Sequence, residues 1–227
     1  MRARLKKHIN KKSAVSADLF FKTGPGEYSA HDQFLGVSVP NLRLVAKEFA
    51  TASLSETLKL LHSPFNEERQ LALFILTGQF RKGNSSEQKK IYQLLLKNRK
   101  WVNNWNLVDS CAHWIIGAYL LNRDRSILTK LARSKNLWDR RLAVVSTFAF
   151  IRANDLAETF RLSKMLMNDE EDLMHKACGW MLREAGKRDS VRLEKFILEN
   201  VSKMPRTMLR YSIEKMPDRR RKEILSL

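Results

Sequence analysis

Trp105 and Asp109 are the pair of residues whose types and spacing are best suited to chemistry. They are four residues apart in the segment from Asn103 to Tyr119, where apolar residues recur with the spacing of a helix. Both side chains should therefore lie on one side of that helix. A carboxylate near a helix N-terminus stays ionised, because the helix dipole and the free amides favour the anion. The ionised carboxylate of Asp109 would then lie beside the indole ring of Trp105.

A purely structural role for Asp109 is the alternative interpretation. In that case its carboxylate only caps the helix or complements the helix dipole. Asn103 and Asn104 are also candidates for the N-cap, because a short side-chain acceptor can satisfy the free amides there. The residues of this segment alone do not separate the two interpretations.

The rest of the chain predicts helices joined by short polar turns. No segment alternates strictly in twos, as a half-buried strand would. Local signals mark helix starts at Pro40, at the Ser53–Glu56 capping box and at Asn66, which is expected to be an N-cap. The Gly24-Pro25-Gly26 stretch begins a loop. We therefore predict an all-α protein.

The predicted helices pair, and the pairs resemble one another. One helix of each pair carries a polar or charged residue followed by two small or apolar residues, at Gln70, Asp109, Arg141 and Lys176. The offsets are 39, 32 and 35 residues, and a further step of 30 reaches Arg206. Irregular periods of this size are typical of stacked helix pairs of the HEAT kind. We predict HEAT-like helical repeats that form a single curved solenoid over residues 1–227, as one domain; a generic helical bundle is the alternative.

In such a solenoid the repeated residues would form a row along a concave basic groove. Two indoles, Trp105 and Trp180, would flank the row, and one carboxylate would be set into it. Basic side chains bind phosphates, and an aromatic face can lie against a sugar or a base. We expect three basic residues to be exposed on the face of the indoles: Arg141, Lys176 and Arg183. A solvated charged face with no partner is the alternative.

The charge of the chain favours a polyanionic partner. Its 227 residues include 42 Lys and Arg against 24 Asp and Glu, which gives a formal net charge of +18. Nucleic acid is the commonest polyanion that such a protein meets. No apolar run approaches the roughly 18 to 20 residues of a membrane-spanning helix, and the first residues lack the apolar region of a secretory signal. We expect a cytoplasmic protein that does not bind a membrane.

The sequence indicates neither a metal site nor a cofactor. It contains no Gly-rich phosphate loop, no HExxH motif and no cluster of Cys and His ligands. Cys111 and Cys178 lie among helical apolar residues and are expected to be core residues in a reducing compartment. His113 follows Asp109 by one helical turn, and we expect a structural role for it.

These residues resemble the AlkD-like DNA alkylation repair glycosylases, which are built from HEAT-like repeats. The similarity runs over most of the chain, through FFKTG, FLGVSVPNLR, WNLVDS, NLWDRRLA and HKACGWMLREAGKRD. The resemblance implies that Asp109 of WNLVD is catalytic, with Trp105 beside it. It also implies that Arg141 of WDRRLA faces DNA, and that Trp180 and Arg183 of GWMLRE contact it.

An aromatic residue near the N-terminus of the family maps onto Phe20 or Phe21, so its hydroxyl is missing in this chain. The resemblance implies a monomer that hydrolyses the N-glycosidic bond of N3- or N7-alkylated purines in double-stranded DNA and so initiates base excision repair. Asp109 would stabilise positive charge on the deoxyribose, and Arg141 and Lys176 would hold the backbone. The alternative is a non-catalytic HEAT-like module that binds DNA or a protein partner.

Overall fold

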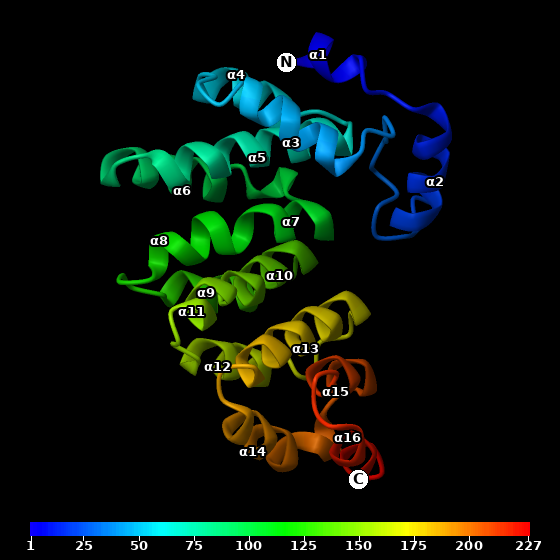
Figure 1. The fold of residues 1–227 in the computed structure, drawn as a ribbon, viewed down its shortest axis with the longest axis vertical. Helices are drawn as coiled ribbons and strands as arrows, with labels where there is room; N and C mark the ends of the chain where they lie inside the picture. Colours follow the sequence, from blue (N-terminus) through cyan, green and yellow to red (C-terminus); the bar gives the residue numbers. More distant parts are fainter. The chain divides into compact units, whose positions relative to one another are not determined.

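The computed structural model describes residues 1–227 and confirms the predicted all-α fold. Helices follow one another along the whole chain, and the only strand-like pairing is an isolated bridge between Gln33 and Phe65 (Figure 1). The chain divides into an N-terminal unit, Met1–Cys111, and a C-terminal unit, Ala112–Leu227. That the whole chain forms one curved solenoid with a basic groove stays a prediction. None of its helices is both long and apolar enough to cross a membrane.

The N-terminal unit is built around one long helix, α5. Its helices are α1 (Arg2–Lys6), α2 (Lys11–Phe21), α3 (Val39–Glu48), α4 (Leu54–Leu61), α5 (Asn66–Lys82), α6 (Ser85–Lys97) and α7 (Trp105–Cys111), with a short 3-10 turn at Arg99–Trp101. Helices α3, α4, α6 and α7 all pack against α5, which is why α5 buries apolar residues on nearly every side. The core of this unit therefore lies around α5, and α7 is placed by it.

The predicted helix starts in this unit are confirmed in two cases and wrong in one. Pro40 lies in the first turn of α3, and the capping box of Ser53 and Glu56 opens α4. Asn66 is not the N-cap of α5, because the helix begins at Asn66 itself and Phe65 precedes it. The amide of Asn66 is engaged elsewhere, in a buried network described below.

The C-terminal unit continues the pattern of short helices. It contains a π-helical segment (Ala112–Gly117), α8 (Ala118–Leu120), α9 (Ser126–Ala132), α10 (Leu137–Ser146), α11 (Phe148–Arg152), α12 (Ala157–Met165), α13 (Asp172–Gly186), α14 (Ser190–Asn200), a 3-10 turn (Val201–Lys203), α15 (Arg206–Ser212) and α16 (Asp218–Leu225). Helix α13 packs against α10 on one side and against α15 on another. The helices that carry Arg141, Lys176 and Arg206 are therefore neighbours, as the repeat predicts.

Gly179 shows how closely α13 and α15 approach each other. A Cβ atom added to Gly179 would lie 2.5 Å from the Cβ atom of Tyr211 and 2.6 Å from the backbone oxygen of Met208. No larger residue fits at such distances without a shift of the backbone. The glycine therefore allows the close contact that gives this pair of helices its place in the core.

Candidate active site

Helix α7 carries Trp105 and Asp109, and Asn104 caps it. The side-chain oxygen of Asn104 accepts a hydrogen bond from the Trp105 N–H at 2.7 Å, and its carbonyl accepts one from the Val108 N–H at 3.0 Å. No acidic residue lies in the first turn of α7. Asp109 lies in the second turn, where the effect of the helix N-terminus has faded. The interpretation of Asp109 as a cap is therefore wrong.

Trp105 and Asp109 line one cavity of about 540 Å³ in the N-terminal unit. This confirms that the two side chains lie on one side of α7. Helices α2, α3 and α5 and the loop before α3 supply the other walls, among them the side chains of Phe20, Phe21, Phe34, Arg43 and Gln70. Gln70 and Asp109, equivalent residues of the predicted repeat, thus share one cavity. Gln70 also donates a hydrogen bond to Ser110 at 3.2 Å.

A stack of aromatic rings holds the Trp105 indole in place. The Phe21 ring lies parallel to it, with 5.1 Å between centroids and 19° between planes, and the Phe34 ring continues the stack at 4.7 Å from Phe21. Phe20 meets the indole edge-on at 5.8 Å. Each such pair contributes about 0.5–1.5 kcal/mol beyond the area that it buries. The stack therefore fixes the ring that borders the cavity.

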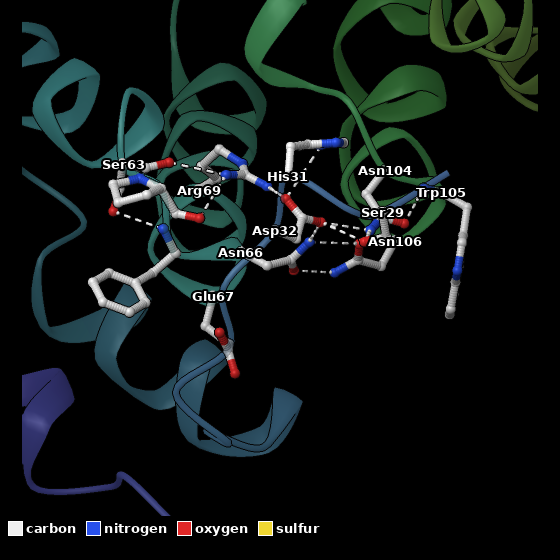
Figure 2. Close-up of polar contacts among 12 residues, drawn as sticks. Ser29, His31, Asp32, Ser63, Asn66, Glu67, Arg69, Asn104, Trp105 and Asn106 are labelled. Carbon is white, nitrogen blue, oxygen red and sulfur yellow. Dashed lines mark hydrogen bonds and ion pairs between the residues drawn. The ribbon is translucent and has the colours of Figure 1, made fainter. Parts of the chain in front are cut away.

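A buried carboxylate, Asp32, organises the start of α7 (Figure 2). It accepts hydrogen bonds from the side chains of Asn104 at 2.6 Å, Asn66 at 2.9 Å and Ser29 at 2.9 Å. The guanidinium of Arg69, which is 1% exposed, pairs with its other oxygen. A buried charge is stable only when it is paired and hydrogen-bonded in this way.

The Asp32 network joins three segments that are far apart in the sequence. Ser29 and Asp32 belong to the loop between α2 and α3, Asn66 opens α5, and Asn104 precedes α7. Asn106 donates a second link to the Asn66 side-chain oxygen at 2.7 Å. A hydrogen-bonded network of this kind favours one arrangement of its elements, since any other would leave more buried polar groups unpaired. The start of α7, and with it Trp105, is held from both the loop and α5.

Glu67 and Gly36 fix a further wall of the cavity. The Glu67 carboxylate accepts hydrogen bonds from three successive backbone N–H groups, those of Leu35 at 3.0 Å, Gly36 at 2.8 Å and Val37 at 3.3 Å. Burial raises the pKa of Glu67 above its ordinary value, and these three hydrogen bonds oppose the rise. Gly36 has φ of +75°, and an added Cβ would lie 2.0 Å from the Asn10 carbonyl oxygen. The start of α2 therefore rests directly on this loop.

The other predicted site residues lie in the C-terminal unit, and for two of them, Arg141 and Arg183, the predicted exposure is wrong. Arg141 is only 5% exposed, and its guanidinium donates a hydrogen bond to the Leu173 carbonyl at 2.7 Å. The sequence period placed Arg141 on the repeated face of α10. The next helix packs against that face, and the guanidinium is used to join α10 to α13.

Lys176 and Arg183 are more accessible than Arg141, and both have acidic neighbours. The Lys176 side chain is 41% exposed and lies 2.7 Å from the Asp172 carboxylate, one turn earlier on α13. The Arg183 side chain is 18% exposed and pairs with Glu184 at 3.3 Å and with Glu214. Lys176 is therefore partly exposed, whereas the predicted exposure of Arg183 is wrong, because its side chain is largely covered and its charge is balanced.

Trp180 belongs to a second group of rings, within the C-terminal unit. It lies 5.9 Å from Phe148, which meets the His113 ring edge-on at 5.2 Å. Burial, followed by the charge of Arg152, lowers the pKa of His113 to about 4. His113 is thus a neutral, buried ring near pH 7, in keeping with the structural role predicted for it.

Comparison with known proteins agrees with this description of the fold. A family model described as "DNA alkylation repair enzyme" matches residues 1–216. The chain belongs to this family. A solved structure described as a predicted DNA alkylation repair enzyme from Enterococcus faecalis has a similar fold, with a TM-score of 0.71 at 16% identity, over 93% of this chain and 98% of that one. No curated protein matches the chain. Membership of a DNA repair family makes DNA the substrate.

The sequence of this DNA alkylation repair family member does not single out Asp32, Glu67 or Phe34. Each is an ordinary residue in or near a loop, and its role depends on partners more than 30 residues away or on ring packing. One signal was present: asparagines recur at two helix starts, at 66, 104 and 106, and each is next to at least one aromatic residue. Buried amides in such places need partners, and this predicts a polar network.

Neither a metal nor a reactive thiol is indicated by the side chains of this protein. No group of three or more His, Cys, Asp or Glu residues is placed to hold a metal ion. Cys111 and Cys178 are both free and buried, which confirms their prediction as core residues. Burial raises the pKa of both thiols, so neither is a nucleophilic thiolate near pH 7. Asp109 remains the candidate for chemistry.

Proposed function

We propose that this protein is a DNA glycosylase that removes N3- or N7-alkylated purines from duplex DNA. The observation that carries the proposal is the cavity of the N-terminal unit, where the Asp109 carboxylate and the stacked Trp105 indole line the same wall. An anion beside an aromatic face is suited to a centre that becomes positively charged. Membership of the DNA alkylation repair family supports alkylated bases as the damage that is removed.

The proposed reaction breaks the bond between C1′ of the deoxyribose and the nitrogen of the alkylated base. That base carries a positive charge, so it takes the bonding electron pair and leaves as a neutral molecule without a strong general acid. Positive charge then develops on the sugar, as an oxocarbenium-like centre. Asp109 stabilises this charge and orients the water that adds to C1′, and the proton of that water passes to solvent.

The size of the electrostatic contribution is sufficient for a catalytic role. A unit pair of opposite charges at about 4 Å, with an effective dielectric constant near 20, interacts by roughly 4 kcal/mol. Because about 1.4 kcal/mol corresponds to a tenfold change in rate, one such contact supplies on the order of a thousandfold. The effect requires a carboxylate whose position is already fixed, since reorganisation would consume part of it.

The Asp32 network and the aromatic stack supply that fixed position. Asn104 and Asn106 anchor the start of α7, and the rings of Phe21 and Phe34 hold the indole one turn before Asp109. None of these residues needs to touch the reacting atoms. We assign them to positioning, and Asp109 alone to catalysis.

We also propose a binding role for the C-terminal unit. Trp180 would lie against a sugar or base, and Lys176, with its 41% exposed side chain, would contact a backbone phosphate. Arg183 would have to exchange its carboxylate partners for a phosphate, so its contribution should be smaller. For the buried Arg141 a structural role replaces the backbone contact expected from the resemblance.

The experiment that tests the proposal is base release from a defined duplex. The full chain is incubated with duplex DNA containing one N7-methylguanine, and free base and abasic sites are measured against the same duplex without the lesion. Release from the methylated duplex alone is the expected result. A protein that binds both duplexes and releases no base would be a non-catalytic DNA-binding module, and the proposal would fail.

A further inference from the structure

Gln70, on the helix next to α7, lies level with Asp109. The Asn106 side chain donates to the Asn66 side chain at 2.7 Å (Figure 2). One turn further along both helices, the Gln70 side chain donates to Ser110 at 3.2 Å. Helices α5 and α7 therefore run in the same direction and in register. Because Asp109 directly precedes Ser110, the Gln70 carboxamide and the Asp109 carboxylate belong to one level of the cavity that both residues line.

The orientation of the Gln70 carboxamide follows from its partner. Ser110 donates its hydroxyl proton to the Asn106 carbonyl at 2.6 Å, so the Ser110 oxygen accepts from the NH2 group of Gln70. The carboxamide oxygen of Gln70 consequently points away from Ser110. This oxygen accepts no hydrogen bond from the protein, although the residue as a whole is only 6% exposed.

A carboxamide oxygen in such a place requires a donor from outside the protein. Amide groups that are largely buried are nearly always hydrogen-bonded, because an unpaired one loses its bonds to water without replacement. The Gln70 oxygen is not fully enclosed, and the residue lines the cavity. A small molecule in the cavity can therefore donate to it.

The chemistry of the two acceptors indicates which molecule fits. The Asp109 carboxylate and the Gln70 oxygen line the same cavity, and neither can donate a proton when Asp109 is ionised. A molecule that bonds both must carry two O–H donors on one small centre, as water does. A simple alcohol has only one. Because a carboxamide is uncharged, Gln70 adds an acceptor without a second negative charge, which would repel Asp109 and the DNA phosphates.

We propose that Gln70 and Asp109 together hold the water that attacks C1′. One O–H of this water donates to the Gln70 carboxamide oxygen, and the other donates to Asp109. The water oxygen forms a bond to C1′ as the bond from C1′ to the base breaks, the base takes the electron pair, and one water proton passes to solvent. Gln70 thus selects water as the nucleophile. The inference rests on the proposed function and names the residue that places its second reactant.

The test is competition between water and methanol during base release by the full chain. A duplex with one N7-methylguanine is incubated with and without methanol, and mass spectrometry measures the abasic site against its methyl glycoside, after subtraction of release without protein. The parent should form almost only the abasic site, since methanol cannot donate to both acceptors. In Gln70→Met the share of methyl glycoside should rise severalfold, towards the share of methanol in the solvent. Single-turnover release should slow about fivefold, the effect of one hydrogen bond, at unchanged DNA affinity.

Gln79→Met is the matched control. Gln79 is also on α5, but its amide donates to the carbonyls of Ala50 and Ala52, at 3.0 and 2.7 Å, and it lines a separate hollow. This variant loses two hydrogen bonds, so its Tm should fall at least as far as that of Gln70→Met, while its product ratio stays that of the parent. If Gln70 only joins α5 to α7, Gln70→Met also lowers the Tm and keeps the parent's product ratio, which would overturn the inference.

Two further variants separate the oxygen from the fold. Gln70→Glu keeps an acceptor oxygen at this position and should return the product ratio towards that of the parent. Gln70→Asn keeps the amide but withdraws it by one methylene, and should raise the share of methyl glycoside even if Gln70→Met does not fold. A Gln70→Asn variant with the parent's product ratio would contradict the role of the oxygen.

Failure of this inference and failure of the proposed function give different results. If the parent releases no methylated base, the glycosylase proposal fails, and the role of Gln70 fails with it. If the parent releases base and all Gln70 variants give its product ratio, the Gln70 inference fails alone. A parent that already forms methyl glycoside in proportion to the methanol present also overturns it, since no water is then held.

Discussion

Trp105 and Trp180 are two indoles on helices of the same repeat pattern, yet their surroundings differ. Trp105 stands at the start of α7, stacked on Phe21, beside a cavity, with the Asp32 network behind it. Trp180 lies in the middle of α13 and meets Phe148 at a tilt, in a group of rings that includes the neutral His113. The surroundings of Trp105 hold charged and polar groups in fixed positions. The surroundings of Trp180 consist mainly of apolar packing, with balanced ion pairs nearby.

The difference suggests that the N-terminal unit carries out catalysis and that the C-terminal unit contributes to DNA binding. A catalytic carboxylate needs a rigid, satisfied surrounding, which the N-terminal unit supplies through groups from three segments. A backbone-binding surface needs only accessible charge and tolerates movement. If the two units differ in this way, substitutions around Asp109 should change the rate of excision, and those in the C-terminal unit should change stability or DNA affinity.

The largest effect is expected for Asp109→Asn. Asparagine keeps the size of the side chain and removes its charge, so excision of N7-methylguanine should fall at least about a hundredfold in single turnover. DNA binding should hold or tighten, because an anion has left the DNA-binding surface. Asp172→Asn, on the exposed end of α13, is the control and should stay within a fewfold of the parent. If Asp109 had only a structural role, the activity of the variant would remain intact.

The next effect concerns His113 and pH. Its pKa is about 4 in the folded protein, below the ordinary value of 6.5, because burial and then Arg152 disfavour the charged ring. Below pH 6.5 the unfolded chain takes up a proton that the folded protein does not, so stability is lost as pH falls towards 4. The loss should be about 2 kcal/mol between pH 7 and 4.5. The free energy of unfolding, measured in urea at both pH values, should fall less in His113→Gln than in the parent. An equal fall in parent and variant would contradict the lowered pKa of His113.

Arg141→Ala should act on stability rather than on binding. The substitution leaves the Leu173 carbonyl without its donor between α10 and α13, at a cost of about 1–3 kcal/mol. The salt dependence of DNA binding should not change. Lys176→Ala is the opposite case, with little effect on stability and a salt slope reduced by about one phosphate contact. An equally stable Arg141 variant with a reduced slope would restore its role as a backbone contact.

The smallest effect separates the two indoles directly. Trp105→Ala removes the ring that stacks on Phe21, and we expect excision to slow about tenfold, the upper range of one aromatic pair. Trp105→Phe should recover most of this rate. Trp180→Ala should change excision only a fewfold and act mainly on affinity. Equal losses of excision rate for the two alanine variants would contradict the assignment of catalysis to the N-terminal unit and of binding to the C-terminal unit.

The local features of the fold could be predicted from the sequence, and the long-range ones could not. The spacing of Trp105 and Asp109 placed both on one side of a helix, because neighbours on a helix follow from the backbone alone. The Asn104 to Ser29 hydrogen bond spans 75 residues, and no local pattern contains it. Arg141 was placed on the correct helix, but its exposure depended on how α13 packs, which the period does not encode.

The Asp32 network has a consequence for the divergence of this family. Arg69 balances a carboxylate that two asparagines also bind. Removal of Arg69 or Asp32 leaves the other charge buried and unpaired, at a cost of several kcal/mol, and removal of either asparagine takes away a buried hydrogen bond. A lineage cannot lose these residues one at a time without passing through a chain that folds poorly. They should therefore be inherited as a block or replaced together. The asparagines that hold α7 would then trace common ancestry more faithfully than the exposed lysines.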